Sequence, residues 1–80
     1  FNAALAKMLN GDNDGALKAL DGVEPTAEVY YLKGIIGARS ENPELMKSNL
    51  QSAFDKDGTL KDKAKGDAEF MKVWDSPIFQ

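Results

Sequence analysis

The sequence has no cysteine and no histidine among its 80 residues. These two absences exclude disulfide bonds, a thiol nucleophile, an imidazole base and the usual zinc ligands. The absence of cysteine is compatible with any compartment, so it does not fix the redox environment. The remaining acid–base candidates are carboxylates, and most of them lie at predicted turns or on polar helix faces rather than in a desolvated cleft. We therefore expect no enzymatic activity and no cofactor.

A surplus of basic residues and a long apolar run are also missing. The sequence contains 10 lysine and arginine residues against 13 aspartate and glutamate residues, which gives a formal net charge of −3. Nucleic-acid-binding domains usually have a basic face, so we expect no nucleic-acid partner. The most apolar run, VYYLKGIIGA, is much shorter than a membrane span and contains Lys33, so we expect no direct membrane insertion.

Eighty residues are enough for one small domain with a modest core. The sequence starts with Phe1 rather than methionine, and its first residues, FNAALAKML, already have the pattern of an apolar helix. They do not have the pattern of a signal peptide. We expect residues 1–80 to form a single domain that is the C-terminal fragment of a longer repeat protein, with any targeting signal upstream.

Turn-forming residues divide the sequence into five predicted helices, and no segment alternates polar and apolar residues over the length of a strand. The expected fold class is therefore all-α, with about five antiparallel helices. Thr26 and Asn42 are predicted N-caps, Gly11 and Gly58 follow helix ends, and Pro77 prevents continuation of the last helix. Four of the predicted helices cover about residues 1–9, 13–20, 43–56 and 60–74. The third lies within EPTAEVYYLKGIIGARS, with Thr26 as its N-cap and Arg39 in its last turn.

Apolar side chains follow helical spacing in the last two predicted helices, which indicates one buried face on each. These residues are Met46, Leu50, Ala53 and Phe54 in the fourth helix, and Leu60, Ala64, Ala68, Met71 and Trp74 in the fifth. Asp67 borders the apolar stripe of the fifth helix. We expect its carboxylate to accept a hydrogen bond from neighbouring backbone.

The third predicted helix is apolar over nearly its whole circumference. Such a helix is buried on several sides or keeps one side for a partner. It also contains Gly34 and Gly37, each of which costs about 1 kcal/mol relative to alanine within a helix. We expect close approach of a neighbouring helix to compensate this cost, and we therefore predict that the third helix is stacked between others.

A shift of 30 residues aligns parts of the sequence with itself. It places Asp12 on Asn42 at two predicted helix starts, and Leu20 on Leu50. Two helical hairpins of similar design therefore follow one another, at residues 1–23 and 26–57. The fifth helix begins a third unit, at residues 60–80.

At these positions the sequence resembles the tetratricopeptide repeat (TPR) family, whose units are helical hairpins with aromatic, large and small residues at fixed positions. Tyr30 matches the opening aromatic residue, Gly34 a small residue, Leu50 a later large residue and Ala53 the final alanine. The resemblance covers residues 1–74. It implies stacked TPR-like hairpins with a C-terminal capping helix.

The end of the sequence is similar to the closing repeats of long TPR proteins of Gram-negative bacterial envelopes. This similarity, and nothing in the composition, implies a periplasmic or outer-membrane-associated location. It also implies a terminal cap in which Trp74, Ile78 and Phe79 fold onto the last apolar face.

Residues 10–21, NGDNDGALKALD, also match the spacing of a calcium-binding loop, which needs oxygen ligands at its first, third and fifth positions, glycine at the sixth and a carboxylate at the twelfth. The matching residues are Asn10, Asp12, Asp14, Gly15 and Asp21. Calcium would require residues 14–18 to wrap an ion, whereas the repeat requires them in a helix that Asp12 or Asn13 caps. We favour the structural turn and keep the calcium loop as the alternative.

In TPR arrays the first helices of successive hairpins line a concave groove that binds a protein or peptide. The resemblance therefore implies a non-enzymatic protein-interaction or scaffold module, with an apolar groove edged by Arg39. The implied groove residues are Tyr31, Leu32, Ile35, Arg39, Leu5, Leu9 and Asn2. In the alternative, these residues pack against upstream repeats of the same chain, and the domain is a structural end-cap of a longer solenoid with no ligand of its own.

Overall fold

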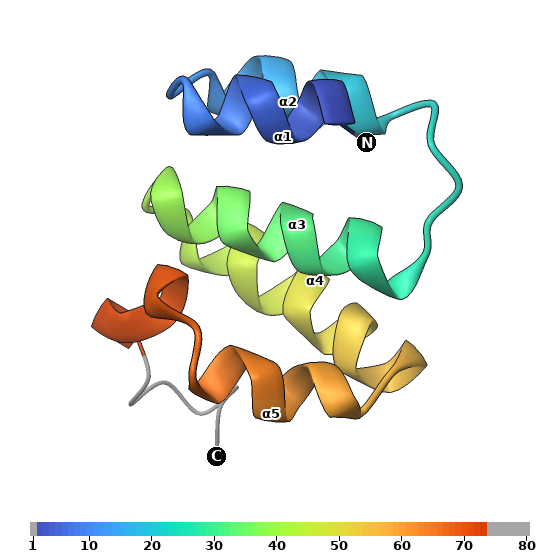
Figure 1. Ribbon diagram of the computed structural model, residues 1–80, viewed down its shortest axis with the longest axis vertical. Coiled ribbons are helices and arrows are strands. Elements are labelled where there is room, and N and C mark those ends of the chain that lie inside the picture. The colour runs from blue at the N-terminus through green and yellow to red at the C-terminus, as the bar shows by residue number, and fades with distance from the viewer. Residues whose placement is uncertain (1, 74–80) are drawn as a thin grey trace.

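A computed structural model of the chain describes residues 2–73 (Figure 1). Its elements are α1 (Asn2–Leu9), α2 (Asn13–Leu20), α3 (Ala27–Arg39), α4 (Pro43–Lys56), α5 (Thr59–Lys65) and the 3₁₀ helix η1 (Ala68–Val73). Every regular element within residues 2–73 is helical, so the predicted all-α class is confirmed. α1 packs on α2 and α3 packs on α4, and Figure 1 shows these pairs in successive layers with α5 below them.

The turns within the two helix pairs have the same construction. After α1, Gly11 has a φ of +86°, and the Asp12 N–H donates to the Lys7 carbonyl at 2.8 Å. After α3, Glu41 has a φ of +56°, and the Asn42 N–H donates to the Gly37 carbonyl at 2.8 Å. Both ends have the Schellman geometry, in which a left-handed residue lets the chain leave the helix.

Each turn leads directly into a side-chain cap for the next helix. Asp12 Oδ1 accepts a hydrogen bond from the Gly15 N–H at 2.9 Å, and Asn42 Oδ1 accepts one from the Leu45 N–H at 3.2 Å. These bonds satisfy backbone donors that have no partner inside a helix. The 30-residue spacing of the sequence is therefore repeated in the turns and caps of the structure.

The core consists of two clusters that share α3. The first cluster contains Ala4, Met8, Ala16, Leu20, Val29, Leu32 and Ile36, and the second contains Tyr31, Met46, Leu50, Ala53, Leu60, Ala64 and Phe70. Ile35 of α3 packs against both. α3 is therefore packed against other helices on two sides, which is one of the two alternatives that its apolar circumference predicts.

Gly34 and Gly37 lie where α3 and α4 approach each other closely, as predicted. A Cβ atom at Gly37 would lie 2.5 Å from the backbone nitrogen of Met46, and one at Gly34 would lie 2.6 Å from Cδ2 of Leu50. Real Cβ atoms essentially never approach other atoms so closely. The two glycines therefore allow a helix–helix distance that no larger residue would permit without a shift.

The fifth predicted helix differs from the structure. Instead of continuing to residue 74, α5 ends at Lys65, and η1 follows after Gly66 and Asp67. Because the chain changes direction there, Phe70 is buried, whereas Met71 is 60% exposed. The predicted stripe through Ala68 and Met71 is therefore wrong beyond Ala64.

The predicted cap residues Trp74, Ile78 and Phe79 lie outside the described residues. Among the helices that the structure does describe, none is long and apolar enough to span a bilayer.

Candidate functional site

The calcium-loop alternative required a non-helical backbone, and the structure contradicts it. Asn13–Leu20 is helical, Asp12 is its N-cap, and Asp14 lies in its first turn. Gly15 has a different role from the glycine of a calcium loop, because a Cβ there would meet the carboxylate that caps the helix. Within residues 2–73 no group of three or more acidic residues is placed to hold a metal ion, so the acidic candidate ligands Asp12, Asp14 and Asp21 form no such group. The fourth candidate, Asn10, lies in the turn between α1 and α2.

Four of the predicted groove residues line one pocket, which has a volume of about 240 Å³. Its lining residues are Leu5 of α1, Glu28, Tyr31, Leu32 and Ile35 of α3, Leu60 and Lys63 of α5, and Asp67. We call this the apolar pocket, because four of its eight lining residues are aliphatic and one is aromatic. Residues of α1, α3 and α5 therefore all contribute to the pocket wall.

Accessibility differs strongly between the lining residues of the apolar pocket. Tyr31 is 6% exposed and Leu32 is 3% exposed, so they form its floor. Leu5 is 36% exposed and lies at its α1 side. Leu9, which is 60% exposed, does not line the pocket. Asn2 lies in α1, and its side chain is not described.

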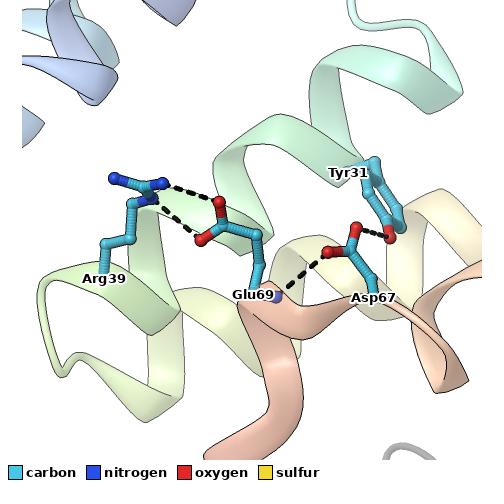
Figure 2. A network of polar contacts seen from close by, with 4 residues as sticks. All are labelled: Tyr31, Arg39, Asp67 and Glu69. Carbon is cyan, nitrogen blue, oxygen red and sulfur yellow. Dashed lines mark hydrogen bonds and ion pairs between the residues drawn. The ribbon is translucent and has the colours of Figure 1, made fainter.

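Tyr31 connects the apolar pocket to the segment that follows α5 (Figure 2). Its hydroxyl donates a hydrogen bond of 2.8 Å to Oδ2 of Asp67, and its ring meets Phe70 edge-to-face with centroids 5.7 Å apart. Lys63 Nζ lies 5.2 Å from the centroid of the same ring. Burial raises the pKa of the Tyr31 hydroxyl above the usual tyrosine value, and the bond to Asp67 and the nearby negative charges raise it further.

Asp67 also accepts a second hydrogen bond, from neighbouring backbone, as the sequence predicts. Its Oδ1 accepts from the Glu69 backbone N–H at 3.0 Å, which fixes the start of η1. One carboxylate therefore joins α3 to the turn of residues 67–70, which we call the C-terminal turn.

Arg39 binds the C-terminal turn rather than the apolar pocket (Figure 2). Its Nε donates to Oε1 of Glu69 at 2.9 Å and its Nη2 donates to Oε2 at 2.6 Å, so the ion pair is bidentate. The hydrogen bonds to Glu69 raise the pKa of Arg39. Arg39 and Glu69 line a separate hollow of about 240 Å³ together with Ala38, Glu41, Ala68 and Met71.

Sequence reasoning missed four lining residues of the apolar pocket: Glu28, Leu60, Lys63 and Asp67. Leu60 and Lys63 are three positions apart, which is the spacing of one helix face, and this spacing was a usable signal. Asp67 lies after the end of α5, so helical spacing does not account for its place in the pocket. Glu28 had no such signal, because an acidic residue in the first turn of a helix is already explained by the helix dipole.

No protein-family model matches the chain, and neither a curated protein nor a solved structure is significantly similar to it.

Proposed function

We propose that this chain is a non-enzymatic, TPR-like module that binds a protein or peptide in the apolar pocket. The main support is the origin of the pocket walls, because α1, α3 and α5 each contribute to them. α1 and α3 are the first members of the two packed helix pairs, and α5 follows the second pair. In the TPR family, which the sequence resembles, the first helices of successive hairpins form the binding groove.

The dimensions and chemistry of the pocket favour a protein side chain over a small molecule. Its volume of about 240 Å³ lies below the range of roughly 300–1,000 Å³ that is typical of small-molecule sites. Its lining is mainly apolar, and tyrosine is a residue type that often dominates interface energetics. One or two apolar side chains from a partner would fill such a space.

A second candidate function is that of a structural end-cap for a longer solenoid. It is favoured by the C-terminal turn, which is joined to α3 through Asp67, Glu69 and the buried Phe70. A terminal repeat needs such a covering to keep an array soluble. Under either function, the envelope location implied by the sequence resemblance stays an expectation.

Selection of peptides from a random library, followed by titration against two matched variants, tests the binding function. Leu5→Gln places an amide at the pocket edge, whereas Leu9→Gln makes the same change on α1 outside the pocket. We expect Leu5→Gln to weaken binding of a selected peptide about tenfold, equal to a loss of roughly 1.4 kcal/mol. Leu9→Gln should have little effect.

Two results would reject the binding function. One is that no peptide is enriched by the folded protein, which would leave the end-cap function. The other is that the selected peptides bind the Leu5→Gln and wild-type proteins equally, which would place their binding site elsewhere.

A further inference from the structure

Three charged residues line the apolar pocket, and two of them lie around the same ring. Lys63 Nζ is 5.2 Å from the ring centroid of Tyr31, and Asp67 accepts a hydrogen bond from the hydroxyl of that tyrosine. The positive charge of Lys63 and the negative charge of Asp67 therefore act on the same region of the pocket and offset each other. The charge at this side of the pocket is nearly balanced.

Glu28 is the third charged residue, and its charge is not balanced. It lies in the first turn of α3, is exposed, and forms no ion pair with any described residue. The chain as a whole has a formal net charge of −3, which adds to the negative potential. The apolar pocket thus combines an apolar floor with one carboxylate at its edge that has no ion-pair partner among the described residues.

We propose, resting on the binding function above, that the partner is a peptide segment with an apolar side chain next to a lysine or arginine. The apolar side chain enters between Leu5, Leu32 and Ile35. The neighbouring basic side chain pairs with Glu28 at the solvent-exposed edge. The long-range negative potential of the chain also favours the approach of a basic segment.

The chain offers a matched control for a charge reversal at this position. Glu28 is the second residue after the N-cap Thr26, and Glu44 is the second residue after the N-cap Asn42. Both glutamates are exposed, but only Glu28 lines the apolar pocket. Glu28→Lys and Glu44→Lys therefore disturb a helix N-terminus in the same way, while only the first alters the pocket.

The experiment is selection from a random heptapeptide library by the wild-type protein and by the Glu28→Lys and Glu44→Lys variants. Circular dichroism would first establish that each variant is folded. We expect the wild type and Glu44→Lys to enrich an apolar residue beside lysine or arginine, and Glu28→Lys to enrich an apolar residue beside aspartate or glutamate. With the milder Glu28→Gln change, the affinity for a wild-type-selected peptide should fall about threefold, as is typical of an exposed ion pair.

The possible failures of the two proposals are distinguishable. If peptides are enriched for apolar residues and lose affinity with Leu5→Gln, but show no basic preference or keep it in Glu28→Lys, the assignment of Glu28 is wrong and the binding function stands. If no peptide is enriched, both proposals are wrong. If Glu44→Lys changes the preference as much as Glu28→Lys does, net charge rather than the pocket selects the peptide, and the assignment of Glu28 is again wrong.

Discussion

Tyr31 belongs to the core and to the apolar pocket at once. Its ring packs on the buried Phe70, and its hydroxyl reaches Asp67, where the chain has just left α5. A buried hydroxyl needs such a partner, because burial without a hydrogen bond is costly. The same surroundings disfavour the tyrosinate anion, which accounts for the raised pKa of Tyr31.

The raised pKa of Tyr31 predicts a loss of stability at alkaline pH. Below about pH 10, tyrosine is protonated in both the folded and the unfolded chain. Above it, the unfolded chain releases this proton more readily than the folded chain, so the free energy of unfolding falls by up to roughly 1.4 kcal/mol per pH unit. Urea unfolding of the wild type and of Tyr31→Phe between pH 9 and pH 11 measures this effect.

The difference between the two proteins isolates the contribution of Tyr31 from that of other alkaline groups. At pH 9, Tyr31→Phe should be less stable by about 1 kcal/mol, because Asp67 loses its donor. The difference in the free energy of unfolding between the two proteins should become smaller as the pH rises above 10, because only the wild type loses stability through Tyr31. Parallel stability curves for the two proteins would contradict the proposed environment of the hydroxyl.

At the scale of single elements, the contact between α3 and α4 depends on two glycines. We expect Gly37→Ala to lower the free energy of unfolding by about 1–3 kcal/mol, because its Cβ would meet the backbone of α4. This loss exceeds the gain of about 1 kcal/mol or less in helix propensity. Thermal and urea unfolding followed by circular dichroism measure it.

Two further glycines provide a graded comparison for Gly37→Ala. In Gly34→Ala the new Cβ meets the Leu50 side chain rather than backbone, and a side chain shifts more readily than backbone, so the loss should be smaller. In Gly58→Ala the Cβ would meet nothing within 4 Å, so the stability should change by less than about 0.5 kcal/mol. A different order of the three variants would argue against the close helix approach.

The extents of the first four helices could be predicted from the sequence, because local signals mark their ends. Thr26 and Asn42 cap helices in the structure as predicted, Asp12 rather than its alternative Asn13 caps α2, and Gly11 follows the end of α1. These signals act over three or four residues and do not depend on the rest of the fold. Capping residues and turn residues were therefore sufficient to predict where these helices begin and end.

The end of α5 was missed because an apparent periodicity outweighed a turn signal. Ala64, Ala68 and Met71 continue a helical stripe across Gly66 in the sequence. The pair Gly66-Asp67 repeats the pair Gly11-Asp12, and both follow a helix end in the structure. If Gly66-Asp67 is taken as a helix end in the same way as Gly11-Asp12, the sequence predicts the end of α5 near Lys65.

The candidate site was only partly predictable, since it depends on that break. Leu5, Tyr31, Leu32 and Ile35 were predicted from repeat positions, and they line one pocket. Arg39 was predicted at the same groove, but it binds Glu69, which the turn after α5 brings close. A long-range contact of this kind has no local signal in the sequence.

At the scale of the whole molecule, small size makes a single buried ring important. A domain of 80 residues has a free energy of unfolding of roughly 4–12 kcal/mol. Phe70 is fully buried and is the only aromatic residue of the C-terminal turn. We expect Phe70→Ala to remove about 3–5 kcal/mol, a large part of the total, in urea unfolding at neutral pH.

Met71 is the matched control for Phe70, because it is the next residue in η1 and is 60% exposed. Met71→Ala should change the free energy of unfolding by less than about 0.5 kcal/mol. Equal losses for the two variants would show that Phe70 is not the side chain that anchors η1 to the core.

The position of α3 in both core clusters also determines how the molecule comes apart. A chain of stacked hairpins can melt one unit at a time when each unit keeps its own core. Here α3 belongs to both clusters, so the loss of either cluster removes buried contacts from the same helix and weakens the packing of the other. The stabilities of the two clusters are therefore coupled through the 13 residues of α3. We expect both clusters to unfold in one cooperative transition.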